Sequence, residues 1–106
     1  SSDVCSSDLT AILVNSARGA IVKQAELATA LNSGTIAGAA IDVFEVEPIA
    51  PDDGLLACDN AVFAPHLGSA TFATRSKMSR LACENIIAVL HGHRPPFLVN
   101  PDVWKD

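Results

Sequence analysis

Three short apolar runs, each followed by polar residues, limit most strongly what this chain can fold into. The runs lie at residues 11–14, 36–43 and 61–64. The unbroken run at residues 11–14 is typical of a strand buried on both faces of a parallel sheet, residues 36–43 are a second candidate for a buried strand, and residues 61–64 are a third short strand. A stretch of helix formers at residues 23–32, followed by Gly34 as a C-cap, supplies the first crossover connection. The order of these segments predicts an α/β fold with parallel strands.

The rest of the chain is expected to hold a long loop, a second helix and a tail. Residues 44–60 contain two prolines within a few positions of a glycine and predict a surface loop, with the Leu55–Leu56 pair reaching back to the core. Apolar residues at helical spacing predict a helix over residues 71–91 that ends at Gly92. The tail, residues 93–106, is expected to be extended. So few strands leave the sheet edges unpaired, which indicates part of a larger sheet.

The first nine residues differ from the rest. They read SSDVCSSDL, are polar, and show neither helical nor strand periodicity. The string resembles the translation of a common sequencing-adapter oligonucleotide. We therefore expect residues 1–9 to be an artefactual or disordered leader, and the natural chain to extend further before Thr10.

Composition excludes several classes of function. Twelve acidic against seven basic residues give a net charge of −5, which argues against a nucleic-acid surface and against a basic membrane patch. The apolar runs are too short for a membrane span, and no secretory signal is visible. Three cysteines at unpatterned positions predict neither a disulfide framework nor a metal site. These features favour a cytoplasmic domain with reduced thiols.

Polar side chains that can carry chemistry follow each predicted strand. Arg18 follows the first run, Asp42 lies near the end of the second and is followed by Glu45 and Glu47, and His66 follows the third. Ligands of open parallel sheets bind beyond the carboxyl ends of the strands. A guanidinium suits a carboxylate or a carbonyl, and a histidine beside a carboxylate suits proton transfer. The placement therefore predicts a site at this edge, although each residue taken alone is more often a surface group.

Three motifs carry a resemblance to a known family. NSARG, AGAAIDVFEVEP and PHLGSAT, in this order, resemble the D-isomer-specific 2-hydroxyacid dehydrogenases, and among them the glyoxylate/hydroxypyruvate and 2-ketogluconate reductases most closely. The resemblance extends over residues 11–101. It implies a partial Rossmann-like, doubly wound fold: the C-terminal half of an NAD(P)-binding domain, here residues 10–92. It also implies an enzyme that transfers a hydride between a nicotinamide cofactor and a small 2-keto or 2-hydroxy acid.

The resemblance also implies residue roles. Arg18 matches the arginine that binds the substrate's carboxylate and keto oxygen, His66 the acid/base, and Glu47 its carboxylate partner. Asp42 matches the acid on the nicotinamide side of the cofactor. Glu45 competes with Glu47 on sequence alone, and only the family's Glu-Pro pair separates the two. The expected cofactor-binding residues are Ser16, Ala17, Arg18, Asp42, His66, Gly68 and Ser69.

Some family features have no counterpart in this sequence. The GxGxxG loop that holds the pyrophosphate is absent, so NAD and NADP are not distinguished. The separate substrate domain is absent as well, and the resemblance implies a homodimeric parent. The same fold and catalytic residues occur in a family branch of NAD-sensing transcriptional co-repressors, which remains the alternative function. A formate-dehydrogenase-like branch replaces the glutamate, whereas Glu47 is present here.

Overall fold

The computed structural model describes residues 8–105, so residues 1–7 of the predicted leader lie outside the described part. The chain forms two compact units, which divide in the sequence between Gly68 and Ser69. The division expected from the sequence, into a leader (residues 1–9), a cofactor-domain part (residues 10–92) and a tail (residues 93–106), stays a prediction. Each unit is described by itself.

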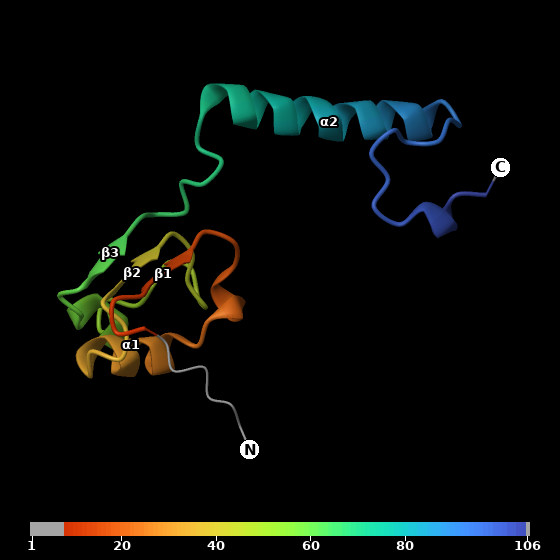
Figure 1. Cartoon of the computed structure of the whole chain (residues 1–106). Coiled ribbons are helices and arrows are strands. Elements are labelled where there is room, and N and C mark those ends of the chain that lie inside the picture. Colours follow the sequence, from red (N-terminus) through yellow and green to blue (C-terminus); the bar gives the residue numbers. More distant parts are fainter. Residues whose placement is uncertain (1–7, 106) are drawn as a thin grey trace, which may run out of the picture. The chain divides into compact units, whose positions relative to one another are not determined.

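The first unit contains a parallel sheet of three strands within the described residues, in the order β1-β2-β3 (Figure 1). The strands are β1 (Ile12–Asn15), β2 (Gly38–Ile41) and β3 (Ala61–Phe63). Residues 12–15 pair in order with residues 38–41, and residues 39–41 pair with residues 61–63. The predicted α/β class is confirmed, and each strand lies within two residues of its predicted position at either end.

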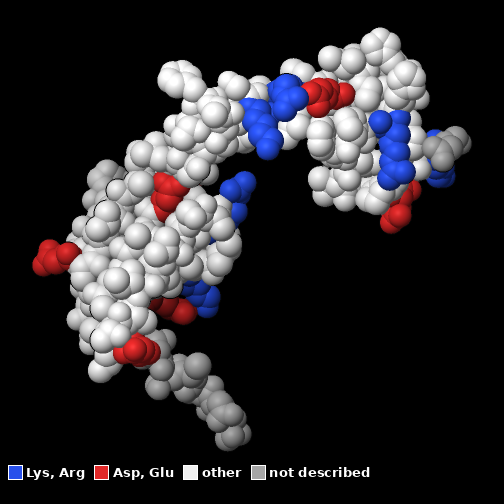
Figure 2. Space-filling view, turned by 45° about the horizontal axis from the view of Figure 1, so that its top comes forward, with Lys and Arg blue, Asp and Glu red and all other residues white. Residues whose placement is uncertain are grey.

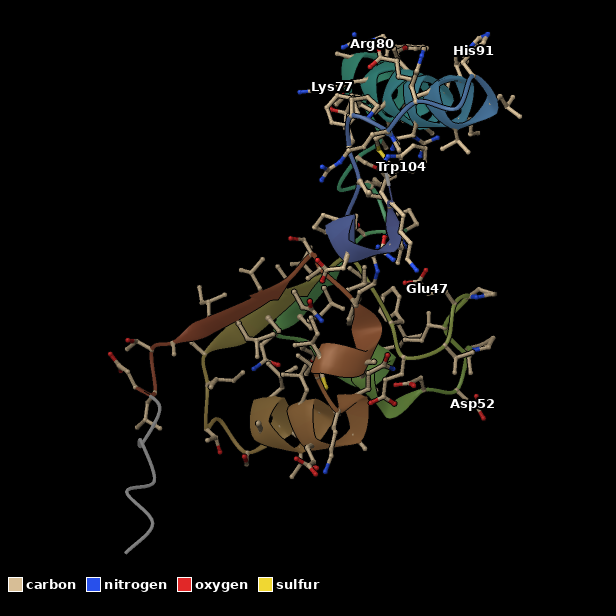
Figure 3. All side chains as sticks on the ribbon, turned by 90° about the vertical axis from the view of Figure 1, so that its right-hand side faces the viewer. Glu47, Asp52, Lys77, Arg80, His91 and Trp104 are labelled. Carbon is tan, nitrogen blue, oxygen red and sulfur yellow. The ribbon has the colours of Figure 1, made fainter. Side chains whose placement is uncertain are left out.

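One face of this sheet is covered by helix α1 (Gln24–Asn32), which lies beneath the strands (Figures 1 and 3). The helix ends where Gly34 adopts φ +69°, the left-handed conformation that glycine enters without steric cost. Its apolar residues meet those of β2 and of the following loop. This core consists of Leu27, Ala28, Leu31, Ile36, Ala39, Ile41, Leu55 and Cys58.

The opposite face of the sheet is open in this unit. Ile12, Val14 and Val62 point away from α1 and are 67%, 69% and 71% exposed. The expectation that the first run is buried on both faces is therefore wrong for β1 in this unit, whereas β2 is largely buried, as expected. A fully apolar run needs cover on both sides of the sheet, but α1 is the one α-helix in residues 8–68 and covers only one side.

The loop between β2 and β3 is partly ordered by a short 3-10 helix, η2 (Gly54–Ala57). Leu55 from this helix is completely buried, whereas Leu56 is 38% exposed. The prediction that this pair returns to the core thus holds for Leu55 alone. Asp53 caps η2, since its carboxylate accepts a hydrogen bond from the Leu55 N–H at 2.9 Å.

The second unit consists of helix α2 (Phe72–Leu90) and the tail. Thr71 caps the helix by accepting from the Thr74 N–H, and Gly92, at φ +72°, follows its end. The tail is not extended throughout, because Pro101–Val103 form a short 3-10 helix, η3. No residue of α2 is fully buried, so its predicted apolar stripe stays largely accessible in the described structure.

The distribution of charged side chains and of cysteines in the described part of the chain does not indicate a further site. On the face shown in Figure 2, acidic and basic side chains are scattered in small groups, and neither sign forms a large patch. Within residues 8–105 no helix is both long and apolar enough to cross a membrane. Cys58 is buried and Cys83 exposed, and both are free thiols.

Candidate functional site

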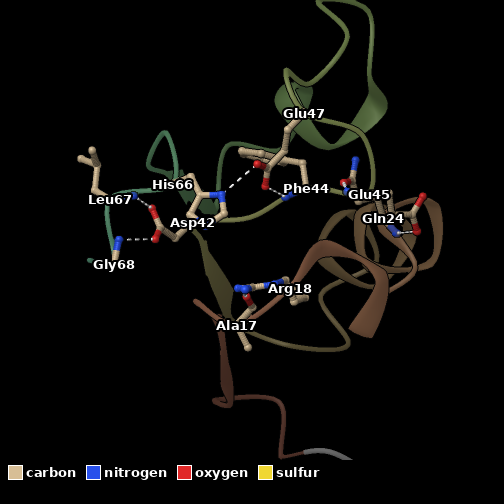
Figure 4. Close-up of polar contacts among 10 residues, drawn as sticks. All are labelled: Ala17, Arg18, Gln24, Asp42, Phe44, Glu45, Glu47, His66, Leu67 and Gly68. Atoms are coloured by element: carbon tan, nitrogen blue, oxygen red, sulfur yellow. Dashed lines mark hydrogen bonds and ion pairs between the residues drawn. The ribbon is translucent and has the colours of Figure 1, made fainter. Parts of the chain in front are cut away.

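The turn after β1 is organised by Asn15, a buried side chain at the strand's last position. Its Oδ1 accepts from the Ala17 N–H at 3.2 Å, and its Nδ2 donates to the Arg18 carbonyl at 3.0 Å. These bonds hold the backbone that carries Arg18. The Arg18 guanidinium is exposed and donates to the Ala17 carbonyl at 2.6 Å (Figure 4). Asn15 was not among the predicted site residues, although its place between a buried strand and an arginine was a usable signal.

Gly19 allows this turn to lie directly against the backbone that follows β2. A Cβ at Gly19 would lie 1.8 Å from the Phe44 carbonyl oxygen and 2.5 Å from the Glu45 nitrogen. Only glycine permits such an approach of two backbones. The segments that carry Arg18 and Glu47 are therefore in direct contact.

Asp42, just beyond β2, binds the loop that follows β3. Its two carboxylate oxygens accept hydrogen bonds from the Leu67 N–H at 2.7 Å and the Gly68 N–H at 2.8 Å (Figure 4). These two residues follow His66 directly. Asp42 thus holds the histidine's own loop in place.

His66 and Glu47 form the central contact of the site. The His66 Nδ1 lies 2.8 Å from the Glu47 Oε2, and the Glu47 Oε1 accepts from the Phe44 N–H at 3.1 Å. His66 adopts φ +57°, a left-handed conformation that costs a residue other than glycine of the order of 1–3 kcal/mol. Such strain is concentrated at functional positions. Glu47 engages Nδ1, and within residues 8–105 no hydrogen bond is made by Nε2, which can therefore face a ligand.

The pKa of Glu47 is lowered from its ordinary value of 4.5. The hydrogen bond from His66 is the main cause, and the bond from the Phe44 N–H and the charges of His66 and Arg18 add to it. A hydrogen bond to the charged form favours that form. Glu47 is therefore an anion at neutral pH and can hold the His66 ring.

The lowered pKa of Glu47 leads to a prediction for the titration of its carboxyl group. In the folded chain, the Glu47 carboxyl is expected to titrate below 4.5, and His66→Ala should raise its pKa toward that value. Because the folded-state pKa is depressed, the stabilisation is complete above pH 4.5 and is lost as the pH falls through the folded value. ¹³C NMR of the side-chain carboxyl measures both. An unchanged Glu47 pKa in the His66→Ala variant would contradict the contact.

The structure separates the two competing glutamates. Glu45 does not contact His66; its carboxylate accepts from the backbone N–H of Gln24 at 3.0 Å, at the positive end of α1. Glu47 alone of the pair meets the histidine. Gln24, like Asn15, was not among the predicted site residues, but unlike Asn15 it offered no signal, because an amide inside a helix pattern does not stand out.

The predicted site residues are thus only partly brought together. Among the described residues, Arg18 forms no ion pair with Glu47, although its charge contributes to the lowered Glu47 pKa. Ser69 belongs to the second unit, so it is not placed relative to the others.

A hollow of about 120 Å³ lies at the carboxyl end of the strands. The residues that line it include the apolar Val14, Ala40 and Val62 and the polar Ser16 and Asp42. An apolar lining with a few polar groups fits a flat, amide-bearing ring such as nicotinamide. The residues present therefore fit the nicotinamide end of a dinucleotide. They supply no glycine-rich turn for its pyrophosphate.

Comparison with known proteins agrees with this geometry. Residues 6–68, more than half of the chain, match the NAD-binding domain of the D-isomer-specific 2-hydroxyacid dehydrogenases. The glyoxylate reductase of Korarchaeum cryptofilum is 55% identical over 96 residues, which cover 91% of this chain and 29% of that enzyme. This chain spans less than a third of the length of such relatives.

Solved structures show the same fold. The NADPH-dependent glyoxylate/hydroxypyruvate reductase of Sinorhizobium meliloti, in complex with citrate, superposes with a TM-score of 0.78 at 39% identity, covering 88% of this chain and 30% of that one. Its complex with NADP and malonate gives a TM-score of 0.69 at 46% identity, over 76% of this chain and 25% of that one. These matches confirm the partial Rossmann-like fold. They also favour the reductases over the co-repressor alternative.

Proposed function

Because the chain belongs to the D-isomer-specific 2-hydroxyacid dehydrogenase family, we propose that it forms the catalytic part of the NAD(P)-binding domain of a reductase for small 2-keto acids. Glyoxylate and hydroxypyruvate are the proposed substrates, and 2-ketogluconate is a further one. The relatives named for the first two support this choice. The observation that carries the proposal is the His66–Glu47 contact, which lies on loops at the same sheet edge as Arg18.

The proposed roles follow from the contacts. A nicotinamide cofactor, when bound, supplies the hydride. Protonated His66 would give its Nε2 proton to the oxygen of the reduced keto group, while Glu47 holds the ring through Nδ1. The Arg18 guanidinium would bind the substrate carboxylate and polarise the keto oxygen. The exposure of His66 and Glu47, 48% and 39%, leaves the pair accessible to a substrate.

The cofactor would lie along the hollow at the strand ends. Ser16, Ala17 and Asp42 would border its nicotinamide, together with the residues from His66 to Gly68. Asp42 retains free lone pairs after binding two backbone N–H groups, so it can also accept from a carboxamide. We further propose residues 10–92 as the cofactor-domain part, a homodimeric parent enzyme and a cytoplasmic location.

A hybrid enzyme tests this proposal. In the Korarchaeum cryptofilum enzyme, the 96 matched residues are replaced by those of this chain. The rest of that enzyme then supplies the glycine-rich loop and the substrate domain. We expect the hybrid to oxidise NADH or NADPH with glyoxylate or hydroxypyruvate. The 106-residue chain alone should not, because without the pyrophosphate loop it has no strong dinucleotide site.

The parent Korarchaeum enzyme is the positive control. A hybrid that is folded and binds cofactor, yet reduces neither acid, would contradict the proposed function. Steady turnover by the 106-residue chain alone would contradict the geometric argument for its inactivity.

A further inference from the structure

Gln24, the first residue of α1, has a buried side-chain amide that the proposed mechanism does not use. It is 7% exposed. Its Oε1 accepts from the Glu45 N–H, and its Nε2 donates to the Asp53 Oδ2 at 3.0 Å. Its backbone N–H also donates to the Glu45 carboxylate. The backbone N–H and both ends of the side-chain amide of Gln24 are thus hydrogen-bonded to Glu45 or Asp53, which lie in the loop between β2 and β3.

These bonds close the segment from residue 45 to residue 53, which carries Glu47. One amide connects the beginning of the segment to its end, because Glu45 and Asp53 bind opposite ends of the same group. Asp53 in turn caps η2 through the Leu55 N–H. The completely buried Leu55 therefore anchors one side of this connection in the core.

Packing alone does not hold this segment. A cavity of about 220 Å³ lies between it and the start of α1, bordered by Gln24, Val46, Pro48, Ile49 and Ala50. Val46 is 73% exposed, so it adds little buried apolar surface. The hydrogen bonds to Gln24 therefore add order to a segment that apolar packing covers only in part.

We propose that Gln24 is a positioning residue that closes the segment from Glu45 to Asp53 and thereby holds Glu47 against His66. The link is short: Glu45 lies next to Phe44, whose N–H binds the Glu47 carboxylate that faces the histidine. Loss of the amide would leave the Glu45 N–H and an Asp53 oxygen without partners, and the segment would move to find water. The consequence for catalysis rests on the proposed function, whereas the structural link does not.

Gln24→Leu in the hybrid enzyme tests the proposal, because leucine keeps the size of the side chain and removes its hydrogen bonds. We expect kcat to fall by about 10- to 10²-fold, as expected for a misplacement of about 1 Å, with the KM for the cofactor nearly unchanged. Asn32→Leu, at the exposed end of the same helix, is the matched control and should leave kcat unchanged.

A swap of donor and acceptor provides the rescue. Gln24→Glu alone places a carboxylate against Asp53 and should impair the segment. Adding Asp53→Asn restores the bond with its direction reversed, since the new amide can donate to the new carboxylate while its oxygen still accepts from the Leu55 N–H. The double variant is expected to recover most of the kcat lost in Gln24→Glu.

Titration of Glu47 in the cofactor-free hybrid separates this proposal from the proposed function, because it requires no turnover. In Gln24→Leu the Glu47 pKa should rise toward 4.5, as the bond to His66 is lost. A Gln24→Leu protein with a lowered thermal midpoint but an unchanged Glu47 pKa would show a merely structural role and overturn the proposal. Absence of rescue in the double variant would overturn it as well.

Discussion

His66→Ala in the hybrid enzyme is expected to lower kcat for 2-keto acid reduction by about 10²–10⁴-fold, the usual contribution of a positioned general acid. Protonation of the developing alkoxide belongs to the chemical step, so the loss should appear in kcat. The side chain contacts Glu47 and leaves the Asp42 clamp on the next two residues intact. Cofactor affinity should therefore change little.

Steady-state kinetics and a fluorescence titration with NADPH measure the two quantities separately. His93→Ala, at an exposed histidine beyond the end of α2, is the matched control and should retain parental turnover. Near-parental kcat in His66→Ala would remove the histidine from the mechanism. A parallel loss of cofactor affinity would instead assign it a binding role.

Gly19→Ala is expected to destabilise the first unit and to abolish most of the activity. The added Cβ would lie 1.8 Å from the Phe44 oxygen, a backbone atom that cannot give way without moving the turn. Overpacking of this kind costs about 1–3 kcal/mol and occasionally more. The displaced Phe44 would also withdraw its N–H from Glu47, so the His66 partner would be misplaced.

Gly54→Ala is the matched control, because a Cβ at Gly54 meets nothing within 4 Å and its φ is not positive. It should change the free energy of unfolding by no more than about 0.5 kcal/mol. Urea denaturation of the hybrid measures both effects, and turnover is measured on the same samples. Equal stability and activity of Gly19→Ala and Gly54→Ala would show that the contact of Gly19 with Phe44 is not required.

Taken together, the polar contacts of the first unit follow one pattern. Two exposed side chains, His66 and Arg18, are carried by loops whose backbones are bonded to less conspicuous groups. Asp42 holds the histidine loop, and Asn15 holds the arginine turn. Packing does little to fix an exposed functional side chain. Hydrogen bonds from neighbouring residues to its backbone therefore have to hold it in position.

The sequence by itself determined the elements and the edge at which the site lies. Apolar runs at 11–14, 36–43 and 61–64 mark the strands because a buried strand must be apolar, and this requirement is local. Gly34 and Gly92 mark helix ends because a left-handed residue is needed there. Since parallel strands share one carboxyl edge, Arg18 and His66 could be assigned to that edge from the sequence alone.

Only the tertiary structure decided which side chains meet. Glu45 and Glu47 carry the same charge two positions apart, and before the structure only the family's Glu-Pro pair favoured Glu47. In the structure Gln24 meets Glu45 while His66 meets Glu47, because contacts across 19 or 21 positions depend on how the loops fold back. The open face of the sheet could likewise not be predicted, since an apolar run indicates that its side chains are buried but not which segment packs against them. Local sequence patterns indicate which segments form strands and helices. Which distant polar groups pair is decided only when the chain folds.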